Sequence, residues 1–341
     1  MKLALVRASW HWWLLRPGPV GQTRTGCDPR GGGLRARPGQ RQTSVGHVGA
    51  TDVTEPLVVA RVARIAPGFV RFHRTAPYVP ENAEMLDVTM PLEAAMMPDP
   101  GGDLISRAVG GADRAWFYWT GRESVRELER TLGIAGRTLD SFESILDFGC
   151  GCGRMLLWMQ ELGRTRALHG TDVDAEAIDW CREHVPYAEV TVNGADPPLP
   201  FRDGAFDLVF SHSVFTHVDE RRQDAWLGEL QRVTCPSGLL VLSTHGEIAL
   251  GADVWRIRER LEDEGIVFID DVFGPEYPLP HWYQSTYHAP WYVCEHWSRW
   301  FEVRAYLPGG ALGVQDHILL QRRAGDATPR RPLAAGPRRR T

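Results

Sequence analysis

Lysine is almost absent from this sequence, and Lys2 is the only one among 341 residues. A P-loop needs a Gly-Lys-Ser/Thr turn and a Schiff-base mechanism needs an amine, so the body of the chain supports neither chemistry. Cysteine is also sparse, with six residues and no Cys-x2-Cys pair. In a chain of this length we therefore expect no disulfide framework, no structural zinc and no other metal site.

Long apolar runs are missing as well. No run reaches the roughly 18 residues that a membrane-spanning helix needs. Residues 3–15 resemble a signal peptide, but Arg7 and His11 interrupt them and no small-residue cleavage site follows. We therefore expect a cytoplasmic protein without a membrane span.

The chain does contain enough apolar residues for a core, and its charge is unevenly distributed. Hydrophobic residues make up 43% and aromatic residues 10%, which is typical of a globular protein. Residues 1–50 carry a net charge of +7 and residues 322–341 a net charge of +6, so the whole-chain value of −5 leaves −18 on the residues between them. An acidic body repels phosphate backbones, so we expect no nucleic-acid partner for the folded part.

The composition predicts four segments. Residues 1–50 and 324–341 are rich in Arg, Gly and Pro without apolar periodicity, and are predicted to be disordered. Residues 51–135 are predicted to form an irregular and helical extension, with a helix at 124–132. The aromatic stretch 114–121 before this helix either covers a ligand as a lid or docks on a sheet edge. Residues 136–323 are predicted to form the main domain.

The strongest local pattern is Ile145–Arg154, where an apolar run containing Asp147 leads into Gly149, Gly151 and Gly153. The run predicts a buried parallel strand, and the alternating glycines predict a sharp turn whose backbone approaches a ligand closely. A dinucleotide fingerprint would need its third glycine at the position of Arg154. No pyrophosphate is therefore expected at this turn.

Apolar and alternating segments continue at the spacing of strand–helix–strand units. Strands are predicted at 167–172, 190–193, 205–211 and 239–244, and helices at 155–162, 175–184, 221–233 and 254–265. Segments 301–306 and 315–320 are predicted to be an antiparallel pair at the sheet edge. This order predicts a Rossmann-like α/β fold with a seven-stranded, mostly parallel sheet, an antiparallel edge strand and helices on both faces.

Residues 145–246 resemble the class I S-adenosylmethionine (SAM)-dependent methyltransferases, in particular bacterial small-molecule enzymes with a type 11/12-like domain. The resemblance rests on the glycine turn, Asp172 at the end of the second strand, 199–201 (Leu-Pro-Phe), 206–209 (Phe-Asp-Leu-Val) and 236–238 (Pro-Ser-Gly). It implies that residues 136–323 bind SAM.

The resemblance also implies how the cofactor is held. Asp172 would accept hydrogen bonds from the ribose, although Asp174 competes with it and also suits the N-cap of the next helix. The N-terminus of helix 155–162 is expected to favour the methionine carboxylate. Asp196, one position later than the family's pattern, is the expected adenine contact. The full predicted cofactor set is Asp147, Gly149, Gly151, Gly153, Asp172, Asp196 and Ser211.

Two histidines are predicted to act as the catalytic base. His217 follows the fourth strand and His245 the fifth, at the sheet edge where ligands bind, and His217 ranks first by position. The aromatic segment 270–300 is expected either to form a substrate wall or to pack in the core. Its predicted substrate-binding residues are His281, Tyr283, Tyr287 and His288.

The sequence thus predicts an enzyme that transfers a methyl group from SAM to an O or N nucleophile of a small molecule such as a sugar or natural product. The alternatives are a non-catalytic SAM-binding protein and a nicotinamide-dependent oxidoreductase, the second of which Arg154 disfavours. The chain also lacks an Asn/Asp-Pro-Pro-Tyr/Phe motif for amino-group methylation.

Overall fold

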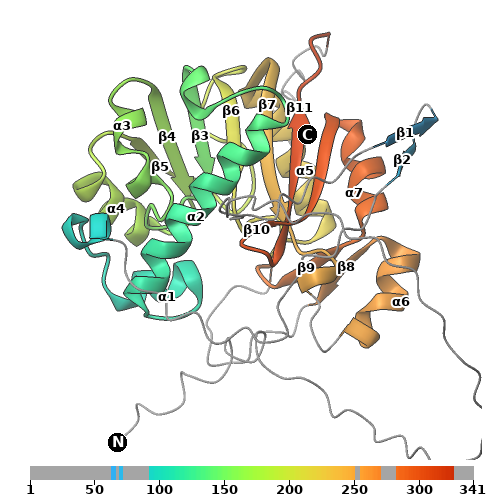
Figure 1. Ribbon diagram of the computed structural model, residues 1–341, viewed down its shortest axis with the longest axis horizontal. Coiled ribbons are helices and arrows are strands. Elements are labelled where there is room, and N and C mark those ends of the chain that lie inside the picture. The colour runs from blue at the N-terminus through green and yellow to red at the C-terminus, as the bar shows by residue number, and fades with distance from the viewer. Residues whose placement is uncertain (1–62, 67–68, 72–91, 250–253, 270–281, 326–341) are drawn as a thin grey trace, which may run out of the picture.

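The computed structural model describes residues 63–66, 69–71, 92–249, 254–269 and 282–325 (Figure 1). The predicted disordered segment 1–50, His281 and most of the predicted tail 324–341 lie outside these residues.

A seven-stranded sheet forms the centre of the described part, in the order β10-β11-β7-β6-β3-β4-β5. Its strands are β3 (Ser144–Phe148), β4 (Ala167–Asp172), β5 (Glu189–Val192), β6 (Phe206–Ser211), β7 (Thr234–Thr244), β10 (Glu302–Ala311) and β11 (Gln315–Gln321). Strands β3 to β7 are mutually parallel, whereas β11 is antiparallel to both of its neighbours, β7 and β10. The predicted fold class is confirmed, with the antiparallel strand one place in from the edge.

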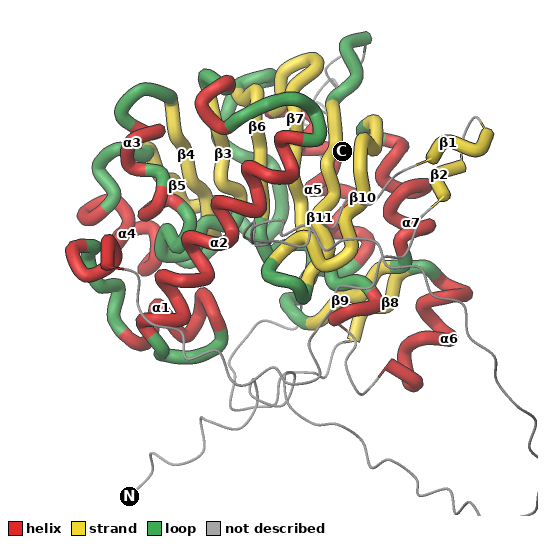
Figure 2. The backbone as a smooth tube through the Cα atoms, viewed as in Figure 1, coloured by secondary structure: helices red, strands yellow, loops and turns green. Residues whose placement is uncertain are grey.

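Helices cover both faces of this sheet (Figure 2). The helices of the described part are α1 (Gly102–Val109), α2 (Arg114–Gly133), α3 (Gln160–Gly163), α4 (Ala175–His184), α5 (Glu220–Val233), α6 (Val254–Glu264) and α7 (Pro290–His296), of which α1 packs beside α2 and α6 beside β8. Ile145 faces a core cluster that includes residues of α1, α2 and α4, and Leu146 faces a second cluster with residues of α5, α6 and α7. Successive residues of one strand thus build the two cores on opposite faces.

Shorter elements complete the described chain. The 3-10 segments are η2 (Leu92–Met96), η3 (Leu139–Ser141), η4 (Leu156–Trp158) and η6 (Trp297–Arg299). Two small antiparallel sheets pair β1 (Ala63–Ala66) with β2 (Phe69–Arg71) and β8 (Ile266–Ile269) with β9 (Ser285–His288). A bridge between His245 and Tyr287 connects β9 to the end of β7. This bridge brings segment 282–288 to the edge where the parallel strands end.

Helix α2 is longer than the predicted helix 124–132, and Figure 1 shows it crossing the front of the sheet. It begins after Asp113, whose side chain accepts a hydrogen bond from the Trp116 N–H at 3.0 Å. Phe117 and Tyr118 are fully buried in the core beneath it. These two aromatic residues therefore dock on the fold instead of covering a ligand.

The prediction of a helix over residues 155–162 is wrong. The chain instead forms the three-residue η4 and the four-residue α3, with Met159 between them at φ −109°. Met155, Leu156 and Leu157 are consecutive and all buried. A regular helix would expose part of such a run, whereas a short 3-10 turn in a tight space buries it on several sides.

Candidate functional site

The predicted site residues gather at one edge of the central sheet. Strands β3, β4, β6 and β7 are parallel and end there, and antiparallel β11 begins there, with Asp316 opposite Thr244. Ligands of open α/β sheets bind at this edge. The ends of these strands and the loops after them carry the glycine turn, Asp172, His217 and His245.

The glycine turn after β3 contains positive φ angles at Gly149 (+84°), Gly151 (+53°) and Gly153 (+74°). A Cβ at position 149 would lie 2.2 Å from Val214 Cγ2, whereas a Cβ at position 151 would meet nothing within 4 Å. Position 149 thus needs glycine because of its neighbour. Position 151 lies beside open space.

Asp172 connects this turn to the end of β4. Its Oδ2 accepts a hydrogen bond from the Gly151 N–H at 2.7 Å, and its Oδ1 accepts one from the Asp174 N–H at 2.9 Å. Each carboxylate oxygen keeps a further lone pair for a ligand donor. The Asp174 carboxylate accepts from the N–H groups of Glu176 and Ala177 and caps α4. The predicted N-cap is confirmed, and Asp172 remains the candidate for the ribose.

Asp147 and Arg154 are buried charged residues at the two ends of the turn, 2% and 8% exposed. Burial raises the pKa of the Asp147 carboxyl to about 8, against the opposing effect of Arg154. Burial likewise lowers the pKa of Arg154 to about 10, while Asp147 counteracts it. The two groups therefore stabilise each other's charged form.

The other two predicted cofactor residues differ in environment. Asp196 is exposed, and its Oδ1 lies 3.3 Å from Nε of Arg222 in an ion pair. Ser211, 4% exposed, has an Oγ with no hydrogen-bond partner among the described residues. A buried hydroxyl without a partner is costly, so the Ser211 Oγ calls for a hydrogen-bond partner that the described residues do not supply.

His217 and His245 lie together, with ring centroids 5.8 Å apart. His217 Nδ1 is 2.9 Å from the Gln284 carbonyl oxygen. A carbonyl only accepts, so Nδ1 carries the proton and Nε2 holds the lone pair. Burial lowers the pKa of His217 to about 4, and burial together with the nearby His217 and His288 lowers the pKa of His245 well below its ordinary value. Both rings are therefore neutral at neutral pH.

The described part of the predicted substrate wall packs against these histidines. The Tyr283 ring stacks on His217 at 4.5 Å, and Asp172 adds to the effect of burial in raising the pKa of Tyr283. The Tyr287 ring lies 5.4 Å from His245. His288 is fully buried, with Nε2 2.9 Å from Oε1 of Gln223. Tyr283 thus packs against His217, while His288 lies in the interior.

Three residues at the same edge were not among the predicted site residues: His212, Gln315 and Asp316. The His212 ring lies 6.4 Å from that of His317 on β11. Gln315 Nε2 donates a hydrogen bond to Ser213 Oγ at 2.6 Å, and Ser213 has a positive φ of 63°. The signal available in the sequence was the strand order, because an antiparallel last strand starts where its parallel neighbours end.

The Asp316 carboxylate is hydrogen-bonded by neighbouring groups of the protein. Its carboxylate accepts hydrogen bonds from the Tyr306 hydroxyl and, at 2.8 Å, from the Gly309 N–H. Burial raises its pKa to about 6. Within the described ranges, no group of three or more His, Cys, Asp or Glu side chains is arranged to hold a metal ion, even with this many histidines nearby.

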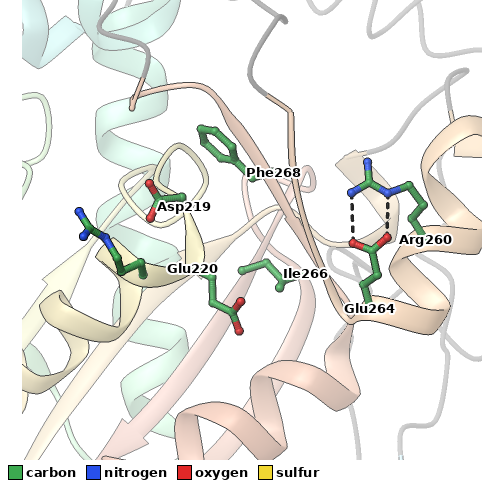
Figure 3. Close-up of a pocket in the computed structure, with 7 residues that line it drawn as sticks. Asp219, Glu220, Arg260, Glu264, Ile266 and Phe268 are labelled. Atoms are coloured by element: carbon green, nitrogen blue, oxygen red, sulfur yellow. Dashed lines mark hydrogen bonds and ion pairs between the residues drawn. The ribbon is translucent and has the colours of Figure 1, made fainter.

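A hollow of about 480 Å³ lies between the start of α5 and the α6–β8 segment (Figure 3). It is lined by Asp219, Glu220, Arg221, Arg260, Glu264, Ile266 and Phe268. Glu264 pairs with Arg260 at 2.9 Å, and Glu220 accepts a hydrogen bond from the Tyr292 hydroxyl at 2.7 Å. None of the predicted site residues lines it. No helix in the described ranges is long and apolar enough to cross a membrane.

Residues 146–242 match the family model described as methyltransferase domain. A ribosomal protein methyltransferase from Geobacter metallireducens is 29% identical over 156 residues, which cover 46% of this chain and 48% of that protein. A putative methyltransferase from Encephalitozoon cuniculi is 35% identical over 133 residues, which cover 38% and 59%. The chain spans about half the length of these curated relatives.

A solved SAM-dependent methyltransferase from Methanosarcina mazei is 22% identical, with a TM-score of 0.40, over 53% of this chain and 92% of that one. Together with the glycine turn and the strand order, the family match identifies residues 146–242 as a class I SAM-dependent methyltransferase domain. The cofactor of this domain is SAM.

Proposed function

We propose that the protein transfers the methyl group of SAM to an O or N nucleophile of a small molecule. The observation that carries the proposal is the glycine turn, in which Gly151 has open space beside it and donates its N–H to Asp172. Backbone of this kind accepts a ligand in close contact, and the Asp172 carboxylate lies next to it.

The residues present fit the cofactor. The backbone of Gly149 and Gly151 would lie beneath it, Asp172 would hold the ribose hydroxyls, and the exposed carboxylate of Asp196 would accept from the adenine amino group. The unpaired Oγ of Ser211 is a further polar group at the same edge. When bound, SAM supplies a methyl group already activated by the sulfonium.

His217 is the proposed base. Its Nδ1–H is held by the Gln284 carbonyl, so Nε2 is the atom that takes a proton from the acceptor. An imidazole with a pKa of about 4 is unprotonated at neutral pH, but it is a weaker base than an imidazole in free solution. General bases contribute about 10²–10⁴-fold, whereas alignment contributes up to roughly 7–11 kcal/mol, so we infer that positioning dominates the rate. His245 is the second candidate.

The acceptor class rests on charge and on the aromatic residues near His217. The net charge of −18 on residues 51–321 disfavours a polyanionic substrate such as nucleic acid. Tyr283 and Tyr287 offer apolar ring faces beside the two histidines, which suits a small molecule with a hydrophobic part.

The test combines binding with transfer. Calorimetry should detect S-adenosylhomocysteine binding to the full chain, and labelled SAM should transfer its methyl group to members of a panel of small alcohols, sugars and amines. Absence of binding would refute the proposal. Binding without transfer to any member of this panel, or to added protein or lipid acceptors, would instead favour the non-catalytic SAM-binding alternative.

A further inference from the structure

Gln223 is a buried polar residue of α5 to which the proposed function gives no role. It is 1% exposed, and its Nε2 donates hydrogen bonds to the carbonyl oxygens of Phe215 at 3.0 Å and Val218 at 2.9 Å. Only the NH2 end of an amide can bind two carbonyl oxygens, so both amide hydrogens are used. These two carbonyls lie on either side of His217 in the chain. Gln223 therefore holds the loop that carries the proposed base against the first turn of α5.

The other end of this amide contacts β9. Its Oε1 lies 2.9 Å from Nε2 of His288, the last residue of that strand. An amide oxygen only accepts, so His288 donates its Nε2–H. The backbone N–H of His288 in turn donates to the His245 carbonyl at 2.7 Å. One side chain thus connects the loop of His217 to the strand that reaches His245, the second candidate base.

The segment at the start of β9 holds the same loop. The Gln284 N–H donates to the His217 carbonyl at 2.8 Å. From Thr286, the N–H donates to the Thr216 carbonyl and the hydroxyl to the Val218 carbonyl, both at 2.8 Å. With the amide on α5 included, every carbonyl oxygen of residues 215–218 accepts a hydrogen bond. A loop held in this way keeps its side chains in a fixed orientation.

We propose that Gln223 is a positioning residue that keeps His217 in the tautomer and orientation of a general base. Its role rests on the proposed function, because it acts through the base of that reaction. The His217 ring must stay against the Gln284 carbonyl, since this contact holds the proton on Nδ1 and makes Nε2 the accepting atom. A neutral ring that carries its proton on Nε2 could not take a proton there from the methyl acceptor.

Loss of the amide would act on this contact through the loop. Without it, the Phe215 and Val218 carbonyls lose the hydrogen bonds that Nε2 donates, and buried carbonyls are costly to leave unpaired. The loop relieves this cost by shifting, and the His217 ring shifts with it relative to the Gln284 carbonyl. The balance between the two tautomers then moves toward the form with the proton on Nε2.

Nitrogen NMR of the full chain with isotope-labelled histidine measures the tautomer of His217 at neutral pH. Its signals are identified by their loss in His217→Ala. Wild type should show mainly the form with the proton on Nδ1. Gln223→Met keeps an unbranched side chain but removes the amide. In this variant the ratio of the Nδ1–H form to the Nε2–H form should fall about 3- to 10-fold, the effect of one hydrogen bond.

A matched control and a conservative variant accompany this measurement. Gln231 is a second buried glutamine of α5, and its Nε2 donates to the Trp300 carbonyl at 2.6 Å, outside the loop of His217. Gln231→Met should therefore leave the tautomer ratio unchanged. Gln223→Glu keeps the shape of the side chain and the acceptor for His288. A carboxyl beside two carbonyl oxygens stays protonated and donates to one of them, so its ratio should lie between those of wild type and Gln223→Met.

The two proposals fail in different ways. If wild type does not bind S-adenosylhomocysteine, the proposed function is refuted, and if His217→Ala keeps full turnover, its base is refuted. Suppose instead that Gln223→Met and Gln223→Glu both show the wild-type tautomer ratio, that Gln231→Met lowers the ratio as much, or that wild type carries the proton on Nε2. Each of these results overturns the positioning role of Gln223. Should Gln223→Met fail to fold, the ratio in Gln223→Glu decides alone.

Turnover adds a second measurement once a methyl acceptor is found. Gln223→Met should lower kcat by up to about 10²-fold with KM nearly unchanged, because a base displaced within the site affects the transition state more than substrate binding. Its affinity for S-adenosylhomocysteine should equal that of wild type. A wild-type kcat in Gln223→Met would overturn the positioning role.

Discussion

The glycine turn contains two positions that should respond differently to the same substitution. Gly149 and Gly151 both have positive φ, at +84° and +53°. A methyl group at 149 meets Val214 Cγ2 at 2.2 Å, but one at 151 enters open space. If SAM occupies that space, Gly149→Ala should mainly lower stability and Gly151→Ala should mainly lower cofactor affinity.

The expected magnitudes follow from two contributions. An alanine in the left-handed region costs about 1–2 kcal/mol, and overpacking costs about 1–3 kcal/mol. In Gly149→Ala the backbone cost and the overpacking cost both arise within the protein, so its free energy of unfolding should fall by about 2–5 kcal/mol. In Gly151→Ala only the backbone cost arises in the absence of ligand. Its overpacking arises against the cofactor and should weaken S-adenosylhomocysteine binding by about 5- to 150-fold.

Urea denaturation without ligand and calorimetry with S-adenosylhomocysteine measure the two effects. Adding Val214→Ala to Gly149→Ala should restore part of the lost stability, because it removes the methyl that the new Cβ meets. The same addition to Gly151→Ala should restore no affinity. Wild-type affinity in Gly151→Ala would refute the reasoning, since the open space beside Gly151 would then not be cofactor space.

Three further predictions concern single side chains. Asp172→Ala should weaken S-adenosylhomocysteine binding by roughly 1.5–3 kcal/mol in calorimetry, whereas Asp174→Ala should lower the melting temperature with little loss of affinity. His217→Ala should lower turnover by about 10²-fold or more at unchanged affinity, and His245→Ala by less; equal turnover of wild type and His217→Ala would exclude His217 as the base. The pKa of Asp147 is raised from 3.8 to about 8, so ionisation lowers stability progressively between these values. Asp147→Asn should therefore gain stability relative to wild type as the pH rises from 5 to 8 in urea denaturation, and a constant difference would contradict this.

The strands were predictable because each leaves a local signal. Segments such as 145–148 and 206–211 place apolar residues on both faces of the sheet, which is typical of buried parallel strands. The Asp174 cap was predictable too, because a short acceptor side chain before a helical pattern is a strong local preference. The prediction of a helix at 155–162 was wrong because the apolar spacing there reflects burial on several sides and not one helical face.

The less predictable part of the site depends on contacts between distant residues. The hydrogen bond between Gln315 and Ser213 joins residues 102 positions apart and exists because β11 lies beside β7. No local pattern reports this adjacency, so Gln315 was not among the predicted site residues. Arg154 was recognised only as the residue that replaces a third glycine. The burial of Arg154 and the charged residues near it are properties of the folded chain that the local sequence does not report.

The contact between Gly246 and Asp316 limits how this sequence can change. A Cβ at position 246 would lie 1.8 Å from Asp316 Oδ2, so no other amino acid fits there while the aspartate stays. Replacing Asp316 first removes the obstacle but also removes the hydrogen bond that the buried Tyr306 hydroxyl donates to this carboxylate, at a cost of about 1.5–3 kcal/mol. Mutational paths through position 246 therefore have a fixed order and pass through a less stable intermediate. A library that varies one position at a time would record Gly246 as immutable, although the restriction belongs to the pair.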